Sequence, residues 1–347
     1  MRTQSSAKIL LQKEASMAEQ TLTLRNLKVV FPSGMGLIRA VEGVDIDIAK
    51  GESVALVGES GCGKSVTSMS IMKLLESPPA ITKMDELVFA GDDIKDYTAS
   101  QMQSIRGKMM AMIFQDAMTS LNPVMTCGKQ IDEMFMRHMN LNKKAAREQT
   151  VKALELVGVP EPRKRAKNFP HELSGGMRQR VLLAMAFACM PKLIIADEPT
   201  TALDVTIQAQ VLSVLKDMQQ KHDVSLLVVT HDLSVVANIA HTVYVMYSGK
   251  IVEKATVAQL FKQPYHPYSA GLLASVPSLS DEGRHFIQIP GSVPHPMKKP
   301  SGCYFHPRCK FAKAQCKETM PPLSAHEAGR LVRCYYPLKT NGGNANG

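Results

Sequence analysis

The chain has no tryptophan, and aromatic residues make up only 5% of its 347 residues. It also lacks a long apolar segment, because the run from Val181 to Met190 is far shorter than the ~20 residues that a membrane-spanning helix needs. The N-terminus carries only Ile9, Leu10 and Leu11 before polar residues, which is not a secretory signal. These absences predict a soluble, intracellular protein.

Acidic residues are scarce relative to basic ones, and the imbalance is uneven along the chain. There are 41 Lys and Arg residues against 31 Asp and Glu, which gives a net charge of +10. Ten basic and two acidic residues lie from Arg284 to the end, so this tail carries +8 and the rest of the chain only +2. A basic surface can bind nucleic acid, an anionic membrane or a phosphorylated ligand, so the charge alone does not decide among these three classes of partner.

The remaining composition, 45% hydrophobic and 21% charged, is that of a folded globular protein. Short apolar runs at residues 53–57, 193–196 and 225–229 predict buried strands, and they alternate with helical patterns such as residues 143–157. This alternation predicts an α/β fold with a mainly parallel core sheet. Residues 1–20 are predicted to be a flexible leader and residues 341–347 a disordered tail, and a rise in Pro, His and Gly near residue 258 predicts a domain change.

The segment Gly-Glu-Ser-Gly-Cys-Gly-Lys-Ser follows the first of these strands and matches the phosphate-loop pattern GxxxxGK followed by Ser or Thr. Its glycines let backbone N–H groups surround phosphate oxygens at the start of a helix. Lys64 supplies a positive charge for the β- and γ-phosphates, and the Ser65 hydroxyl can bind Mg²⁺. The predicted nucleotide-binding residues are Gly58, Glu59, Ser60, Gly61, Cys62, Gly63, Lys64 and Ser65.

A second motif consists of two acidic residues, which follow the apolar run Leu193-Ile194-Ile195-Ala196. Asp197 is predicted to hold Mg²⁺ through its water shell, and Glu198 to polarise the attacking water. Many strands end in an acid, so this motif gains its meaning from the phosphate loop upstream.

A third motif, Leu-Ser-Gly-Gly-Met-Arg-Gln-Arg at residues 173–180, opens a predicted helix. Ser174 is a good N-cap residue, and Gly175 and Gly176 expose N–H groups to an anion. Together with the other two motifs, this segment resembles the signature of the ABC ATPases, with Met177 in place of a glutamine. The resemblance implies an ABC-type P-loop ATPase: a RecA-like core with an antiparallel β subdomain in residues 21–257, and a helical subdomain at about residues 96–180.

The resemblance also implies roles for single residues. Gln115 is similar to the Q-loop glutamine that binds Mg²⁺ and water, and His231 to the switch histidine at the γ-phosphate. Asp204 is similar to the D-loop aspartate, and Phe31 to the aromatic residue that stacks on adenine, although a core position is equally open for Phe31. The family forms head-to-tail dimers, in which Ser174, Gly175, Gly176 and Met177 would serve the ATP held by the partner.

Further stretches resemble one branch of this family, the oligopeptide and dipeptide permease ATPases, and most of all their D-type subunits. Residues 115–123, 266–269, 289–291 and 302–309 carry this resemblance. It implies ATP hydrolysis coupled to uptake of oligopeptides or dipeptides at the cytoplasmic face of the inner (plasma) membrane. The implied partners are a second, different ATPase, two transmembrane permease subunits and an external peptide-binding protein. Two alternatives stay open: a nucleic-acid-linked ABC ATPase, and an importer of nickel chelates, glutathione or other small solutes.

Four of the seven cysteines, Cys303, Cys309, Cys316 and Cys334, lie in the predicted C-terminal extension at residues 258–340. Disulfides are not expected inside a cell, so a metal site is the favoured interpretation of the four thiols. Their spacing contains no CxxC pair, which weakens a zinc assignment. Some peptide-importer ATPases carry a 4Fe-4S cluster on a matching extension, so the resemblance implies such a cluster, with zinc or free thiols as alternatives. Basic residues nearby would then offset its negative charge.

Overall fold

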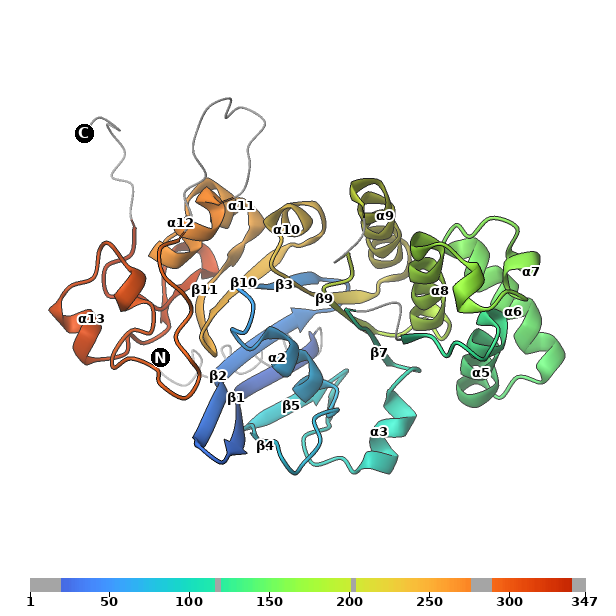
Figure 1. The fold of residues 1–347 in the computed structure, drawn as a ribbon, viewed down its shortest axis with the longest axis horizontal. Coiled ribbons are helices and arrows are strands. Elements are labelled where there is room, and N and C mark those ends of the chain that lie inside the picture. Colours follow the sequence, from blue (N-terminus) through green and yellow to red (C-terminus); the bar gives the residue numbers. More distant parts are fainter. Residues whose placement is uncertain (1–19, 116–119, 201–203, 276–288, 339–347) are drawn as a thin grey trace, which may run out of the picture. The chain divides into compact units, whose positions relative to one another are not determined.

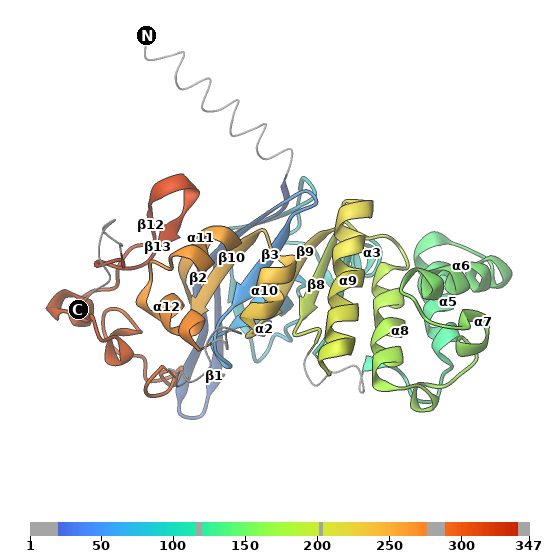
Figure 2. The same cartoon turned by 90° about the horizontal axis from the view of Figure 1, so that it is seen from above.

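The computed structural model describes residues 20–115, 120–200, 204–275 and 289–338, drawn as coloured ribbons in Figures 1 and 2. The chain divides into two compact units, each built from several stretches of sequence. Of the described residues, the first unit comprises those within 20–23, 47–53 and 87–228, and the second comprises those within 24–46, 54–86 and 229–338. The predicted leader up to residue 19 and the predicted tail at residues 341–347 lie outside the described residues.

The first unit contains most of the helices and two paired strands of parallel direction. In chain order its elements are β5 (Glu86–Phe89), β6 (Asp92–Asp93), α3 (Ala99–Ile105), β7 (Met110–Ile113), α5 (Cys127–Met139), α6 (Lys143–Leu156), α7 (Pro162–Arg165), the 3-10 turn η1 (Pro170–Glu172), α8 (Gly175–Phe187), β8 (Leu193–Asp197), α9 (Val205–His222) and β9 (Ser225–Thr230). Strands β7 and β8 pair in parallel, with Met110 opposite Leu193. All five residues of β8 are buried, as its unbroken apolar sequence predicts. The predicted α/β class is therefore confirmed.

Helices α5, α6 and α8 of the first unit pack against one another and form the green group in Figure 1. Asn142 caps α6, because its side chain accepts the N–H of Ala145 at 2.9 Å. The buried carboxylate of Asp132 on α5 accepts hydrogen bonds from Arg147 and Thr150 on α6. These bonds fix the register of the two helices. Within the described ranges, no helix is long and apolar enough to cross a membrane.

The second unit contains a hairpin, a mixed sheet and the C-terminal region. Its elements are β1 (Gln20–Ser33), β2 (Gly36–Ala49), β3 (Ser53–Val57), α2 (Lys64–Ile71), β4 (Ile81–Lys83), α10 (Leu233–Ile239), β10 (Thr242–Tyr247), β11 (Lys250–Thr256), α11 (Val257–Lys262), α12 (Pro267–Ala274), the 3-10 turns η2 (His306–Arg308) and η3 (Glu327–Gly329), α13 (Ala314–Glu318), β12 (Ser324–Ala325) and β13 (Leu331–Val332). The sheet order in this unit is β12-β13-β11-β10-β3. Strand β10 runs parallel to β3 and antiparallel to β11.

The C-terminal region shares a hydrophobic core with these strands. Tyr247 of β10 lies 4.6 Å from Tyr268 of α12 and 5.2 Å from Phe305, measured between ring centroids, and all three residues are buried. Helix α11 packs along β10 and β11, as Figure 2 shows. Large aromatic rings remove much apolar surface from water, so these contacts hold the residues after β11 onto the sheet.

A buried ion pair adds to this attachment. Glu253 of β11 is fully buried, and its carboxylate accepts the N–H groups of Tyr265 and His266 at 2.9 and 2.8 Å. Nε of Arg330 donates to the same carboxylate at 3.0 Å. Because a buried carboxylate costs a large free energy unless it is paired and hydrogen-bonded, this arrangement strongly favours one placement of the chain around residues 265 and 330.

His266 gives the second unit a pH-dependent stability. The side chain is buried and caps α12, with Nδ1 accepting the N–H of Tyr268 at 3.0 Å. Burial, aided by the positive charge of Arg333, lowers the pKa of His266 to about 3. Below pH ~6.5 the unfolded chain binds a proton that the folded chain cannot accept, so stability falls as the pH falls toward 3.

We predict that this histidine accounts for about 2 kcal/mol of stability lost between pH 8 and pH 5. His266→Asn keeps a side-chain oxygen for the cap and removes the titrating group. Urea denaturation of both proteins at the two pH values measures the difference. An equal loss in the wild type and the variant would show that other groups cause the pH dependence.

Candidate nucleotide-binding site

The predicted phosphate loop follows β3 in the second unit and leads directly into α2. Gly63, the N-cap of α2, has φ 109°, and a Cβ at this position would lie 2.6 Å from the carbonyl oxygen of Ala40. Gly58 is equally confined, because its Cβ would lie 2.2 Å from the carbonyl oxygen of Met246. Both positions therefore require glycine, which explains why the loop has this pattern.

Lys64 is buried at the end of this loop and is held by the loop itself. Its Nζ donates to the carbonyl oxygens of Gly58 at 2.7 Å and Glu59 at 3.2 Å. Ser60 and Gly61 are exposed, whereas Ser65 is half-buried. Cys62 is buried, and burial raises the pKa of its thiol to about 11, so it is an unreactive small residue here.

The first unit brings two of the predicted catalytic residues together. Glu198 directly follows the buried strand β8, and its Oε2 accepts a hydrogen bond from Nε2 of Gln115 at 3.0 Å. Glu198 also has a positive φ of 48°, which is uncommon outside glycine and clusters at functional sites. Asp197, the last residue of β8, is 4% exposed. An amide and two carboxylates thus lie at the carboxyl ends of the paired strands β7 and β8, where they can bind a cation and a water molecule.

The predicted signature residues form a helix N-terminus in the same unit. Ser174 caps α8, with its hydroxyl accepting the N–H of Met177 at 3.4 Å. Gly175 has open space at its Cβ position, whereas a Cβ on Gly176 would lie 2.7 Å from Cδ1 of Ile207. The N-terminus of a helix is a position where backbone N–H groups can bind an anion, so the anion-binding role of these residues stays a prediction.

The other predicted site residues lie in separate places. Asp204 caps α9, where its carboxylate accepts the N–H of Ile207 at 2.9 Å. Phe31 is half-buried in β1, and His231 is exposed after β9. Residues 116–119 of the predicted Q-loop and residues 201–203 of the predicted D-loop lie outside the described residues. The nucleotide contacts of these residues stay predictions.

Two residues that sequence reasoning missed contact the phosphate loop from the C-terminal region. The backbone N–H of Glu59 donates to the Tyr268 hydroxyl at 2.9 Å. The Glu59 carboxylate accepts two hydrogen bonds from the guanidinium of Arg308, at 2.7 and 2.9 Å. Arg308 is 249 positions from Glu59 in the sequence, so no local pattern indicates this pair.

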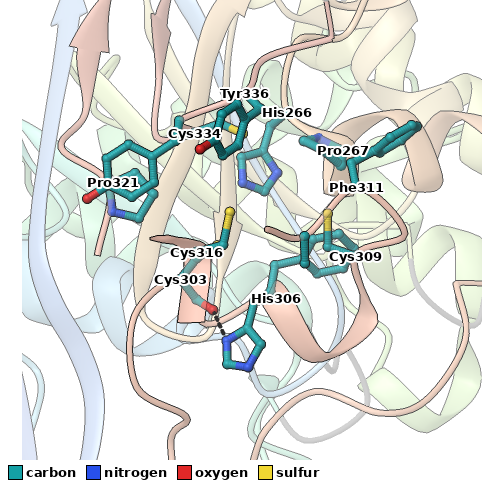
Figure 3. A pocket seen from close by; sticks show the side chains of 13 residues that line it. His266, Pro267, Cys303, His306, Cys309, Phe311, Cys316, Pro321, Cys334 and Tyr336 are labelled. Atoms are coloured by element: carbon teal, nitrogen blue, oxygen red, sulfur yellow. Dashed lines mark hydrogen bonds between the residues drawn. The ribbon is translucent and has the colours of Figure 1, made fainter. Parts of the chain in front are cut away.

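The prediction of a 4Fe-4S cluster, or of zinc, on the four C-terminal cysteines is wrong. These cysteines line one small apolar pocket of about 20 Å³, shown in Figure 3, which has room for about one water molecule and not for four iron and four sulfide ions. The described residues contain no group of three or more His, Cys, Asp or Glu side chains that could hold a metal ion.

Three of these cysteines have a raised pKa. Burial raises the pKa of Cys303 and Cys309, and it raises the pKa of Cys334 to about 12. Burial in apolar surroundings therefore favours the neutral form of these three thiols. The spacing of the cysteines along the chain could not reveal this, because burial and pocket size are tertiary properties.

Three basic residues of the tail form ion pairs with acidic residues, instead of offsetting the charge of a cluster. Lys299 forms an ion pair with Glu42 at 2.6 Å, in addition to the pairs Arg308–Glu59 and Arg330–Glu253. The Lys299, Arg308 and Arg330 side chains are at most 7% exposed. Part of the tail's positive charge is therefore neutralised by acids of the second unit's other segments.

Two family models match the chain. Residues 41–201 match the model described as ABC transporter, and residues 252–316 match the model described as oligopeptide/dipeptide transporter, C-terminal region. The chain belongs to the ATP-binding proteins of the oligopeptide and dipeptide ABC transporters. The predicted family is thereby confirmed.

Individual relatives cover most of the chain. It is 51% identical to the oligopeptide transport ATP-binding protein OppD of Bacillus subtilis (strain 168) over 87% of this chain and 85% of that protein. It is 43% identical to the dipeptide transport ATP-binding protein DppD of Escherichia coli (strain K12) over 92% of this chain and 98% of that protein. Among solved structures, a dimeric ATP-binding cassette in a post-hydrolysis state, bound to ADP and Pi, matches with a TM-score of 0.61 at 25% identity, over 68% of this chain and 98% of that one. The predicted ABC ATPase fold is confirmed.

We predict that the phosphate loop tolerates alanine at Gly61 far better than at Gly63. Gly61 has φ 77° but open space around its Cβ position, so alanine there costs about 1 kcal/mol of backbone strain. At Gly63 the clash with Ala40 adds to the strain, and we expect a loss of ~3 kcal/mol or more. Urea denaturation without nucleotide measures both values. Equal losses would mean that the loop relaxes around the new methyl group.

Proposed function

We propose that this chain is the ATP-hydrolysing subunit of a membrane ABC importer and that it drives uptake of oligopeptides or dipeptides. The observation that carries this proposal is the similarity to peptide-transport ATP-binding proteins along 85–98% of their length, including the C-terminal region. The phosphate loop and the Gln115–Glu198 pair supply the chemistry that such a subunit needs. We propose an ABC domain at residues 21–257, with its helical subdomain at about residues 96–180, and a C-terminal extension at residues 258–340.

In this proposal the predicted residues have separate roles in binding and hydrolysing ATP. Lys64 and the loop N–H groups would bind the phosphates of ATP. Ser65 and Gln115 would hold Mg²⁺, and Asp197 would hold it through its water shell. When bound, Mg²⁺ would supply positive charge that offsets the negative charge of the phosphates. Glu198 orients and polarises the attacking water, and His231 contacts the γ-phosphate. The acceleration comes from positioning and from stabilising negative charge in the transition state.

The proposed working form is a head-to-tail pair of ATPases. Ser174, Gly175, Gly176 and Met177 then contact the ATP that the partner holds, Asp204 lies in the D-loop, and Phe31 stacks on adenine. The helix N-terminus at Ser174 has the geometry for this role, and the matching solved structure is itself described as dimeric. We propose that the partner ATPase is a different chain.

The further proposed partners are two transmembrane permease subunits and an external peptide-binding protein, with this chain attached to the cytoplasmic face of the inner membrane. The permease-type relatives support these partners, and they favour peptides over nickel chelates or glutathione as cargo. They also favour a transporter over a nucleic-acid-linked ATPase.

We predict that Glu198→Gln abolishes ATP turnover, with a loss of at least ~10²-fold, and preserves ATP binding. The amide keeps the size of the side chain and the contact to Gln115 but cannot polarise water, so the closed dimer accumulates with ATP bound. Steady-state phosphate release and size-exclusion chromatography with ATP measure the two effects. Glu155→Gln, at an exposed position on α6, is the matched control and should behave as the wild type. Wild-type turnover in Glu198→Gln would remove Glu198 from this role.

We also predict that the tagged chain, purified in detergent from its native membranes, brings two multispanning membrane proteins and a second ATPase with it. Uptake of a labelled tripeptide by intact cells should stop when the chain is replaced by Glu198→Gln. Binding to DNA or RNA at physiological salt, with a steep salt dependence and no membrane partners, would favour the nucleic-acid alternative instead.

A further inference from the structure

The guanidinium of Arg308 is fully engaged inside the second unit, and the phosphate loop is one of its partners. Its two terminal nitrogens donate to the two oxygens of Glu59 at 2.7 and 2.9 Å. Nε donates to the carbonyl of Pro290 at 2.8 Å, and the terminal nitrogens also reach the carbonyl of Ile289 at 3.3 Å and the Tyr247 hydroxyl at 3.4 Å. All five N–H groups of an arginine can be accounted for by these contacts. The side chain is 4% exposed, so its position is strictly defined.

Glu59 is the second residue of the phosphate loop, and it is held on three sides. Arg308 binds its carboxylate, and the Tyr268 hydroxyl accepts its backbone N–H at 2.9 Å. Its carbonyl oxygen accepts a hydrogen bond from Nζ of Lys64 at 3.2 Å. A shift of Glu59 therefore moves an acceptor of Lys64, the residue that carries the positive charge for the phosphates.

The charge of Glu59 makes this contact matter for an anionic ligand. The Glu59 carboxylate is 29% exposed and belongs to the loop that would surround a triphosphate. An unpaired carboxylate there would repel the phosphates, whereas a bidentate arginine pair neutralises the charge and fixes its direction. A lysine could supply the charge but not the paired geometry.

We propose that Arg308 is a positioning residue for ATP, which acts from the C-terminal region by neutralising Glu59 and holding the start of the phosphate loop in place. This inference rests on the proposed ATP-binding function. It gives the C-terminal region a part in nucleotide binding that acts through Glu59. The ligand concerned is the triphosphate of the nucleotide, because Glu59 belongs to the loop whose pattern is typical of phosphate binding.

The test compares four full-length variants by their affinity for a fluorescent ATP analogue with Mg²⁺. Arg308→Met removes charge and geometry, and Arg308→Lys keeps the charge alone. The double variant Glu59→Gln with Arg308→Met removes both charges together. Lys310→Met is the matched control, since it removes an exposed cation two residues away that contacts the ring of Phe311.

We expect Arg308→Met to raise the Kd for the analogue about tenfold and the double variant to recover most of that loss. The Kd of Arg308→Lys should lie between the values for Arg308→Met and the double variant. The Kd of Lys310→Met should match that of the wild type. The loss in Arg308→Met should shrink at 0.5 M salt, because screening weakens the repulsion from Glu59. A merely structural role would give neither the recovery by Glu59→Gln nor the salt dependence.

Wild-type affinity in Arg308→Met, or a double variant as weak as Arg308→Met, would overturn the inference. If Arg308→Met does not fold, as judged by circular dichroism, Arg308→Lys decides, since unchanged affinity there contradicts the need for a bidentate pair. Failure of the wild type to bind the analogue would instead overturn the proposed function. In the purified transporter, the variants should change KM for ATP more than kcat.

Discussion

The bidentate ion pair between Arg308 and Glu59 is the interaction on which the rest of the second unit depends. It joins the phosphate loop to a segment that follows it by 249 positions, and it lies beside the aromatic core formed by Tyr247, Tyr268 and Phe305. A buried guanidinium is stable only when its donors are satisfied, so the loop and the C-terminal region must take up their positions together. The position of the phosphate loop therefore depends both on its own segment and on the C-terminal region.

The same principle explains the basic tail. Lys299, Arg308 and Arg330 form ion pairs with Glu42, Glu59 and Glu253, each of which lies in an earlier segment of the second unit. Counting charge by region places +8 after residue 283, which suggests a surface for an anionic partner. In the folded chain part of that charge is buried in ion pairs that join the C-terminal region to earlier segments.

The four C-terminal cysteines show how a sequence pattern can mislead. Their number and clustering favoured a metal, and the family resemblance favoured a 4Fe-4S cluster. The folded chain places them around an apolar pocket that is too small for a cluster, and burial raises the pKa of Cys303, Cys309 and Cys334. Whether cysteines become ligands depends on the space between them and on their solvation, and neither quantity is written in their spacing.

The sequence by itself determined the class of protein, because the phosphate loop, the acid-ended strand 193–198 and the helix start at Ser174 are local patterns whose chemistry follows from backbone geometry. It also predicted the buried strands, since an apolar run bounded by turns has few other places in a fold. Only the tertiary structure decided that Gln115 contacts Glu198, that Arg308 and Tyr268 hold the phosphate loop, and that the cysteines enclose an apolar pocket. These contacts join residues far apart along the chain, and their free energies depend on burial and distance, which exist only once the chain is folded.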